Sequence, residues 1–340
     1  MVHIRKRRGW EISESLATPE SVFLDRRRFL ATLGLAGAGF TIGGLVLRAA
    51  EAAASHAKAR AAAAPTKARA GTTPTSRPAA GAIFPARRNP RFVLDRPLSD
   101  EKVAASYNNF YEFTEQKDQV WQKVERFRPK PWRIEIAGLV SKPREIDIDD
   151  LIRALPVEER LYRHRCVEAW AMAVPWTGIP MREFVKWANP TSAAKYIRWV
   201  SFLRPDEAPN QKIATWYPWP YYEGLRMDEA MNELALLGIG IYGHELPKQH
   251  GAPIRVITPW KYGYKSAKCI VRVEFVDQQP RTFWNDIAPN EYSFFSNVNP
   301  KIPHPRWSQA TEKMIGTGER RTTHPFNGYG EWVAGMYPRS

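Results

Sequence analysis

Cys166 is the residue of this sequence whose neighbours could make it chemically reactive. It stands in the run Arg163-His164-Arg165-Cys166-Val167-Glu168. Positive charge nearby favours the thiolate over the thiol, and the thiolate is the form that attacks electrophiles or binds a soft metal. The residues alone leave open a second interpretation, in which Cys166 is a structural cysteine on a strand. Cys269, the other cysteine, lies in a strand-like apolar run and is expected to be a buried small hydrophobic side chain.

A strand predicted over residues 159–167 must position this cysteine. Side chains alternate along a strand, so Tyr162 and His164 share the face of Cys166. Strands and short helices that mix without a regular alternation predict the α+β class rather than a doubly wound sheet. The other predicted strands span 131–140, 195–203, 254–258 and 267–276, and the predicted helices lie near 148–153 and at 181–188 and 227–237.

The N-terminal residues 1–54 have the composition of an export signal. Arg26-Arg27-Arg28-Phe29-Leu30 is followed by the uncharged stretch 31–47 and by the small residues of 49–54. Paired arginines before an apolar stretch and a small-residue zone are typical of a twin-arginine signal peptide. A membrane anchor is the alternative, since residues 29–47 carry no charge, although five glycines make this stretch only mildly hydrophobic.

Residues 55–97 are rich in Ala, Pro, Thr and basic residues and are predicted to form a flexible linker before a folded domain over 98–340. The net charge of +15 favours an anionic partner, which could be nucleic acid, a membrane surface or an anionic small ligand. Nucleic acid is not expected, because the basic residues are scattered among acidic ones and no nucleic-acid-binding motif is present.

Several common catalytic motifs are absent from the sequence. There is no glycine-rich phosphate loop, no Gly-x-Ser-x-Gly, no His-Glu-x-x-His and no Cys-x-x-Cys, which argues against dinucleotide-dependent, hydrolase and zinc enzymes. A Cys-x-x-Cys-His haem site and iron–sulfur spacing are missing as well. Electrons for a redox reaction would therefore come from a partner protein.

Five motifs, in the same order along the chain, carry a resemblance to a known family. The chain resembles the catalytic subunits of bacterial periplasmic protein-methionine-sulfoxide reductases, within the sulfite oxidase family of molybdenum enzymes. The resemblance covers about residues 99–330 and implies a sulfite-oxidase-type molybdopterin-binding fold with mixed sheets and short helices. The motifs span 106–113, 163–170, 251–255, 259–263 and 304–312.

The resemblance also implies roles for individual residues. Cys166 would be the protein ligand to molybdenum, which also takes one pyranopterin dithiolene. Asn109 and Glu168 would lie near the metal, where sulfite-oxidising relatives carry Arg and Tyr, and this difference favours a reductase. The pterin phosphate calls for cations, hydroxyls and backbone N–H groups. The cofactor-binding residues implied are Asn108, Tyr111, Glu112, Ser201, His250, Arg255, Ser266, Ala267 and Lys268.

The activity implied is the reduction of methionine sulfoxide, free and protein-bound, to methionine in the periplasm, as the catalytic subunit of a two-component protein repair system. A haem-containing membrane subunit fed by quinol would supply the electrons, oxidised periplasmic proteins would be substrates, and the twin-arginine translocase would export the chain. Two alternatives remain open: a sulfite dehydrogenase of the same fold, and a non-catalytic periplasmic protein that binds an anion. Cys166 separates the last from the enzymes, because a binding protein has no need of a thiolate.

Overall fold

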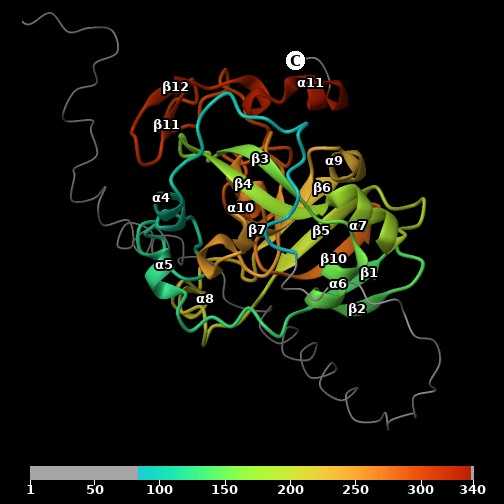
Figure 1. Ribbon diagram of the computed structural model, residues 1–340. Coiled ribbons are helices and arrows are strands. Elements are labelled where there is room, and N and C mark those ends of the chain that lie inside the picture. The colour runs from blue at the N-terminus through green and yellow to red at the C-terminus, as the bar shows by residue number, and fades with distance from the viewer. Residues whose placement is uncertain (1–82, 338–340) are drawn as a thin grey trace, which may run out of the picture. The chain divides into compact units, whose positions relative to one another are not determined.

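The computed structural model describes residues 83–337, which form two mixed sheets joined by short helices (Figure 1). This confirms the α+β class predicted from the sequence. The predicted signal peptide over 1–54 and the predicted linker up to residue 82 lie outside the described residues. Between residues 83 and 337, no helix is both long and apolar enough to span a membrane.

One sheet has five strands in the order β2-β1-β10-β5-β6. β1 and β10 run parallel, whereas the other neighbouring strands are antiparallel. In β1, Ile134 and Ile136 are buried and Arg133 is exposed, which is the alternation of a half-buried strand. The strands are β1 (Arg133–Gly138), β2 (Arg144–Asp147), β5 (Tyr196–Ser201), β6 (Tyr222–Arg226) and β10 (Ile270–Val276).

The second sheet has seven strands, and its β3-β4 hairpin carries Cys166. Its path is β12-β11-β4-β7-β8, with β3 paired to β4 and β9 paired to β7. β4 is buried along its whole length because it has neighbours on both edges. The strands are β3 (Glu158–Arg165), β4 (Trp170–Pro180), β7 (Leu236–Ile241), β8 (His244–Glu245), β9 (Arg255–Ile257), β11 (Thr311–Met314) and β12 (Arg320–Thr322).

The helices are short and end where capping residues stop them. α6 begins after Asp147, whose carboxylate accepts from the N–H of Asp149 and satisfies a free helix donor. α7 ends at Asn189 in the left-handed conformation. The α-helices are α4 (Glu101–Ala105), α5 (Val120–Lys123), α6 (Ile148–Ala154), α7 (Met181–Ala188), α8 (Asn210–Ile213), α9 (Met227–Met231), α10 (Phe283–Ile287) and α11 (Gly330–Val333). The 3-10 helices are η3 (Lys248–His250), η4 (Gly263–Lys265), η5 (Pro325–Gly328) and η6 (Ala334–Met336).

Two sequence predictions are wrong in detail. The helix predicted over 227–237 stops at Met231, and β7 begins at Leu236. A continuous apolar run suits a fully buried strand as well as a helix, so periodicity could not separate the two. The strand predicted over 267–276 begins only at Ile270, because Cys269 has a φ of 50° and breaks the extended backbone.

Residues 83–97, predicted to belong to the linker, pack against the sheet that contains β3. The N–H of Asn89 donates to the carbonyl of Glu159 at 2.8 Å. Phe92 is buried, and the buried guanidinium of Arg96 pairs with Glu312 at 2.5 Å, across 216 residues of sequence. The packed region therefore begins before Leu98. The sequence did not predict this, because one buried aromatic ring and one ion pair produce no periodic pattern.

An aromatic cluster fixes the segment 106–113 to the five-stranded sheet. Phe110 and Phe113 meet with ring centroids 4.8 Å apart, and the rings of Phe127 and Phe202 contact each other at a tilt, 4.9 Å apart. Trp132 joins the cluster at 5.8 Å from Phe127 and donates its indole N–H to a carbonyl of β10. Such buried rings contribute large apolar areas, so this segment, which carries several predicted site residues, is held rigidly.

A buried ion pair joins η4 to β6. Lys265 Nζ lies 2.5 Å from Glu223 Oε2, and both side chains are almost entirely shielded from water. Burial raises the pKa of Glu223 above its ordinary value, while the Lys265 ammonium opposes this shift. Breaking such a pair leaves an uncompensated buried charge.

Replacing Lys265 by Met is expected to lower the free energy of unfolding by about 3 kcal/mol or more, because Glu223 loses its cation. Urea unfolding measures this change. The double variant Lys265→Met/Glu223→Gln should recover much of the loss, since neither charge then remains. Arg133→Met is the control, because Arg133 pairs with Glu145 at the exposed surface and should cost only about 0.5 kcal/mol. A double variant as unstable as Lys265→Met would contradict the prediction.

Candidate functional site

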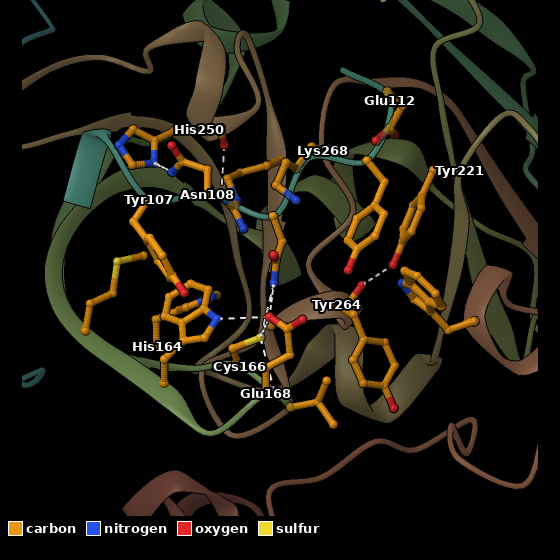
Figure 2. Close-up of a pocket in the computed structure, with 18 of the residues that line it drawn as sticks. Tyr107, Asn108, Glu112, His164, Cys166, Glu168, Tyr221, His250, Tyr264 and Lys268 are labelled. Atoms are coloured by element: carbon orange, nitrogen blue, oxygen red, sulfur yellow. Dashed lines mark hydrogen bonds between the residues drawn. The ribbon is translucent and has the colours of Figure 1, made fainter. Parts of the chain in front are cut away.

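A pocket lies beside the turn of the β3-β4 hairpin (Figure 2). Its walls come from parts of the chain far apart in sequence: the segment 107–112, the hairpin, the loops around β9 and before β10, and α10 with the loop that follows it. Nine predicted site residues line it: Asn108, Asn109, Tyr111, Glu112, Cys166, Glu168, His250, Arg255 and Lys268. Ser201, Ser266 and Ala267 are buried but are not among the lining residues.

Cys166 is placed by the tight turn that joins β3 to β4. The N–H of Cys166 donates to the carbonyl of Trp170 at 2.9 Å, and the N–H of Ala169 donates to the carbonyl of Cys166 at 3.1 Å. Ala169 has a φ of 65°, the left-handed conformation that closes short hairpin loops. Cys166 and Cys269 are both free thiols. The turn presents the Cys166 side chain to the pocket.

The segment after residue 303 fixes this turn from behind. Trp307 Nε1 and Gln309 Nε2 each donate to the carbonyl of Val167 at 2.7 Å. The Arg165 guanidinium donates to the carbonyl of Cys166 and, at 2.8 Å, to Gln309 Oε1. The backbone on both sides of the Cys166 Cα is thus hydrogen-bonded to buried groups, which restricts its movement.

Three donors orient the Glu168 carboxylate beside the sulfur. Asn109 Nδ2 lies 3.3 Å from Cys166 Sγ and donates to Glu168 Oε2 at 3.0 Å. Trp170 Nε1 donates to the same oxygen at 3.2 Å, and Lys117 Nζ lies 3.1 Å from Glu168 Oε1. Glu168 Oε2 is 3.6 Å from Sγ. An amide, a carboxylate and a thiol therefore meet at one point of the pocket wall.

The neighbouring Arg165 favours the thiolate of Cys166, as the sequence predicted, but burial outweighs this effect as long as no metal is bound. Burial raises the pKa of Cys166 well above its ordinary value, the Glu168 carboxylate raises it further, and Arg165 opposes this only in part. Arg165 Nε lies 3.3 Å from Glu312, and Arg163 donates to Asp95 at 2.9 Å, so both guanidinium groups are engaged elsewhere. A bound metal itself displaces the thiol proton, so Cys166 remains suited to be a ligand.

Basic side chains gather on one side of Cys166, where Figure 2 shows His164, His250 and Lys268. Burial, together with the Arg255 and Lys268 cations, lowers the pKa of His164 and of His250 to about 3. Burial also lowers the pKa of Arg255 to about 10 and that of Lys268 to about 8. Glu112 belongs to the same cluster, and burial raises its pKa to about 7 although Lys268 opposes this. An anion would relieve the repulsion between these cations.

Two loops bring the cations together by close backbone approach. The N–H of Val256 donates to the carbonyl of Ala267 at 2.8 Å, and Ser201 Oγ donates to the carbonyl of Lys268 at 2.7 Å. Gly251 has a φ of 97°, and a Cβ there would lie 2.6 Å from the Cβ of Lys268. Only glycine is accommodated at such a position. Ser201 and Ala267 thus support the loop that carries Lys268.

Polar atoms without partners mark where a ligand is needed. Within the described residues, Asn108 Oδ1, Asn109 Oδ1 and Arg255 Nε are buried and make no hydrogen bond. Buried polar groups left unpaired cost about 1–3 kcal/mol each. An anionic ligand with several acceptor oxygens and some donor groups would satisfy Arg255, Lys268 and the amides together. No group of three or more His, Cys, Asp or Glu side chains arranged to hold a metal occurs between residues 83 and 337.

Several lining residues were not predicted from the sequence. His164 shares a strand face with Cys166, and that alternation could have identified it. Lys117, which is not among the lining residues but pairs with Glu168, gave no signal, because several strands and helices separate the two residues in the chain. The aromatic wall gave no signal either, since its rings come from widely separated parts of the chain. It consists of Tyr107, Trp170, Tyr221, Tyr264, Trp284 and Tyr292.

Comparison with known proteins gives consistent results. A family model described as the oxidoreductase molybdopterin binding domain matches residues 121–284. The chain is 48% identical to the protein-methionine-sulfoxide reductase catalytic subunit MsrP of Burkholderia mallei, over 97% of this chain and 94% of that protein. It is 44% identical to the subunit of the same name from Ralstonia nicotianae, over 97% of this chain and 95% of that protein.

Among solved structures, the sulfane dehydrogenase SoxCD of Paracoccus pantotrophus is similar over 59% of this chain and 46% of that chain, with a TM-score of 0.40 and 17% identity. A similarity of this size supports no argument about activity.

Replacing His250 by Asn is expected to make stability less sensitive to acid. The folded state holds His250 neutral with a pKa of about 3, whereas the unfolded chain takes up a proton near its ordinary pKa of about 6.5. The stability that this neutral form contributes is present above about pH 6.5 and is lost as the pH falls toward 3. Between pH 6 and 4, anion-free wild-type protein should lose about 1 kcal/mol per pH unit more than the variant. Urea unfolding at several pH values measures this, and parallel profiles would contradict it.

Proposed function

Since the chain belongs to the family of protein-methionine-sulfoxide reductase catalytic subunits, we propose that it reduces methionine sulfoxide, free and protein-bound, to methionine with a molybdenum–pterin cofactor. The observation that carries this proposal is the meeting of Cys166, Asn109 and Glu168 at one wall of a pocket whose adjoining wall is basic. A thiolate ligand and an anion site side by side suit a metal held by an anionic organic cofactor.

The chain offers groups for each part of such a cofactor. Cys166 would bind the metal, which also takes one pyranopterin dithiolene. Arg255 and Lys268 would bind the phosphate, because Arg255 Nε is buried without a partner and the two cations repel each other. Asn108 Oδ1, also unpartnered, would accept from a pterin N–H. The other residues proposed to contact or support the cofactor are Tyr111, Glu112, Ser201, His250, Ser266 and Ala267.

When bound, this cofactor supplies two-electron oxygen-atom transfer, which is the chemistry that converts a sulfoxide to a thioether. The residues around Cys166 would orient the substrate and handle protons. Release of the oxygen as water requires two protons, and Glu168 Oε2 lies where it can hold one, 3.6 Å from Sγ. Asn109 and Trp170 keep this oxygen in place by donating to it. Lys117 anchors the other oxygen of the carboxylate.

The electron donor and the location are further parts of this proposal. The chain has no haem or iron–sulfur motif of its own, so a partner would supply the electrons. We propose, as the family resemblance implies, that this partner is a haem-containing membrane subunit fed by quinol. The name of the relatives, catalytic subunits, supports a second component. The arginines of 26–28 support export by the twin-arginine translocase. In the periplasm the enzyme would repair oxidised proteins.

Metal analysis of the exported protein, paired with turnover of oxidised protein by a chemical reductant, tests the function. About one molybdenum per chain and recovery of methionine are expected. The Cys166→Ser variant should lose activity by a factor of about 1,000 or more, because a hydroxyl is a poor substitute for a thiolate ligand. Cys269→Ser is the matched control, since Cys269 donates to the carbonyl of Ala252 at 3.0 Å and a hydroxyl preserves this bond.

Retained metal and retained activity in Cys166→Ser would overturn the proposal. Molybdenum without sulfoxide turnover, but with oxidation of sulfite, would assign the chain to the sulfite dehydrogenases instead.

Replacing Arg26, Arg27 and Arg28 together by lysine is expected to retain the protein in the cytoplasm, because the twin-arginine pathway distinguishes arginine from lysine. Cell fractionation measures the distribution, and the same protein should still contain molybdenum. Unchanged export of the lysine variant would contradict the assignment of this signal.

A further inference from the structure

An exposed apolar surface lies beside the pocket, on the segment from α8 to the start of β6. We propose that Ile213, Trp216 and Tyr217, which we call the aromatic shelf, bind the polypeptide that flanks methionine sulfoxide in a protein substrate. This inference rests on the proposed function and deepens it, because it names the surface that would separate protein-bound from free substrate.

Two side chains of the shelf are exposed although they are strongly apolar. The exposed fraction is 63% for Ile213 and 57% for Trp216. Single exposed apolar side chains are common, but an exposed tryptophan beside a pocket marks a recognition surface more often than chance. The segment 216–222 also contains Trp219, Tyr221 and Tyr222, so aromatic side chains are concentrated here.

The shelf is continuous with the wall of the pocket. The ring of Trp216 lies 5.8 Å from that of Tyr217, which lies 6.1 Å from Tyr111 and 6.0 Å from Trp284. Tyr111 and Trp284 both line the pocket. Placed end to end, the ring distances from Trp216 to Tyr217 and from Tyr217 to Tyr111 equal the length of about four residues of extended chain. A peptide whose sulfoxide enters the pocket would therefore meet the shelf with the residues next to it.

The same segment reaches the pocket directly through its later residues. Tyr221 lines the pocket and donates from its hydroxyl to the carbonyl of Tyr264 at 2.5 Å. Figure 2 shows Tyr221 and Tyr264 on the side of Cys166 away from His164 and Tyr107. The shelf thus adjoins the aromatic wall of the pocket.

Hydrogen bonds hold the shelf in a fixed position. Asn210 Nδ2 donates to the carbonyl of Tyr111 at 2.7 Å, and the N–H of Asn210 donates to the carbonyl of Glu112 at 3.0 Å. Tyr217 donates from its hydroxyl to Glu115 at 3.2 Å. Because the shelf is tied to the residues that line the pocket, binding would lose little conformational entropy in the enzyme.

The chemistry of the shelf suits an unfolded protein segment. Methionine is an apolar residue that is usually buried among other apolar residues. These neighbours become accessible when oxidation disrupts a packed core. Trp and Tyr offer flat apolar area together with one polar group, which lets them bind varied sequences. Free methionine sulfoxide has no flanking residues and would not touch the shelf.

The test compares two substrates under one chemical electron donor. Holoenzyme carrying Trp216→Ala is expected to show a kcat/KM for peroxide-oxidised casein about tenfold lower than wild type, mainly through KM, because an interface tryptophan is a frequent hot spot. Its kcat/KM for free methionine sulfoxide should stay within twofold. Ile213→Ser should act in the same direction, and Trp216→Phe should retain most of the activity on casein.

Trp121→Ala is the matched control, because Trp121 is 48% exposed on α5, outside the shelf. It should change neither substrate by more than twofold. An equal loss on casein in this control, an equal loss on both substrates in Trp216→Ala, or no loss at all would each overturn the proposal. Slower quinol-driven turnover of free sulfoxide in Trp216→Ala, with unchanged chemical turnover, would assign the shelf to the electron donor instead.

Binding of oxidised casein without turnover separates the shelf from the proposed function. Wild-type holoenzyme should bind labelled casein in fluorescence anisotropy about tenfold more tightly than Trp216→Ala. If wild type binds in this way but reduces no sulfoxide, the proposed activity fails and the shelf remains a peptide site. If wild type does not bind, the shelf fails, whatever the activity on free sulfoxide.

Discussion

The carbonyl of Val167 accepts two hydrogen bonds, and the geometry of the site depends on them. Trp307 and Gln309 reach this atom from the C-terminal part of the chain at 2.7 Å each. They hold a four-residue turn that would otherwise be free to flex at its tip. Because Glu168 and Cys166 stand on that turn, their distances to Asn109 are set by residues more than a hundred positions away. Pre-organisation of this kind is what lets a site favour one geometry.

The basic side of the pocket shows the opposite situation, since its groups are crowded together at a cost. Arg255 and Lys268 lie close enough for each to depress the charged form of the histidines beside them. Glu112 offsets only part of this charge. The fold keeps these cations together because aromatic packing and the close contact between Gly251 and Lys268 leave their side chains no alternative position. A cluster that is unfavourable by itself is a strong indication of an anionic ligand.

The sequence allowed the fold class, the strand under Cys166 and nine of the pocket residues to be predicted, because the alternation of side chains and the family motifs are local. β4 and β7 were missed, since a buried strand and a buried helix share the same continuous apolar composition. The charge state of the Cys166 thiol could not be predicted either, because the sequence around two arginines does not show how deeply the sulfur is buried. Lys117 and the aromatic wall depend on contacts between distant segments.

The buried ion pair of Arg96 with Glu312 joins residues 216 positions apart, and it has a consequence for biosynthesis. Glu312 also pairs with Arg165, next to Cys166, so the cysteine turn is not braced until almost the entire chain has left the ribosome. A nascent chain would therefore have no finished pocket in which to enclose a cofactor. Contacts of such long range also slow folding. Under the proposed function, cofactor loading would follow translation, and the proposed export would follow folding.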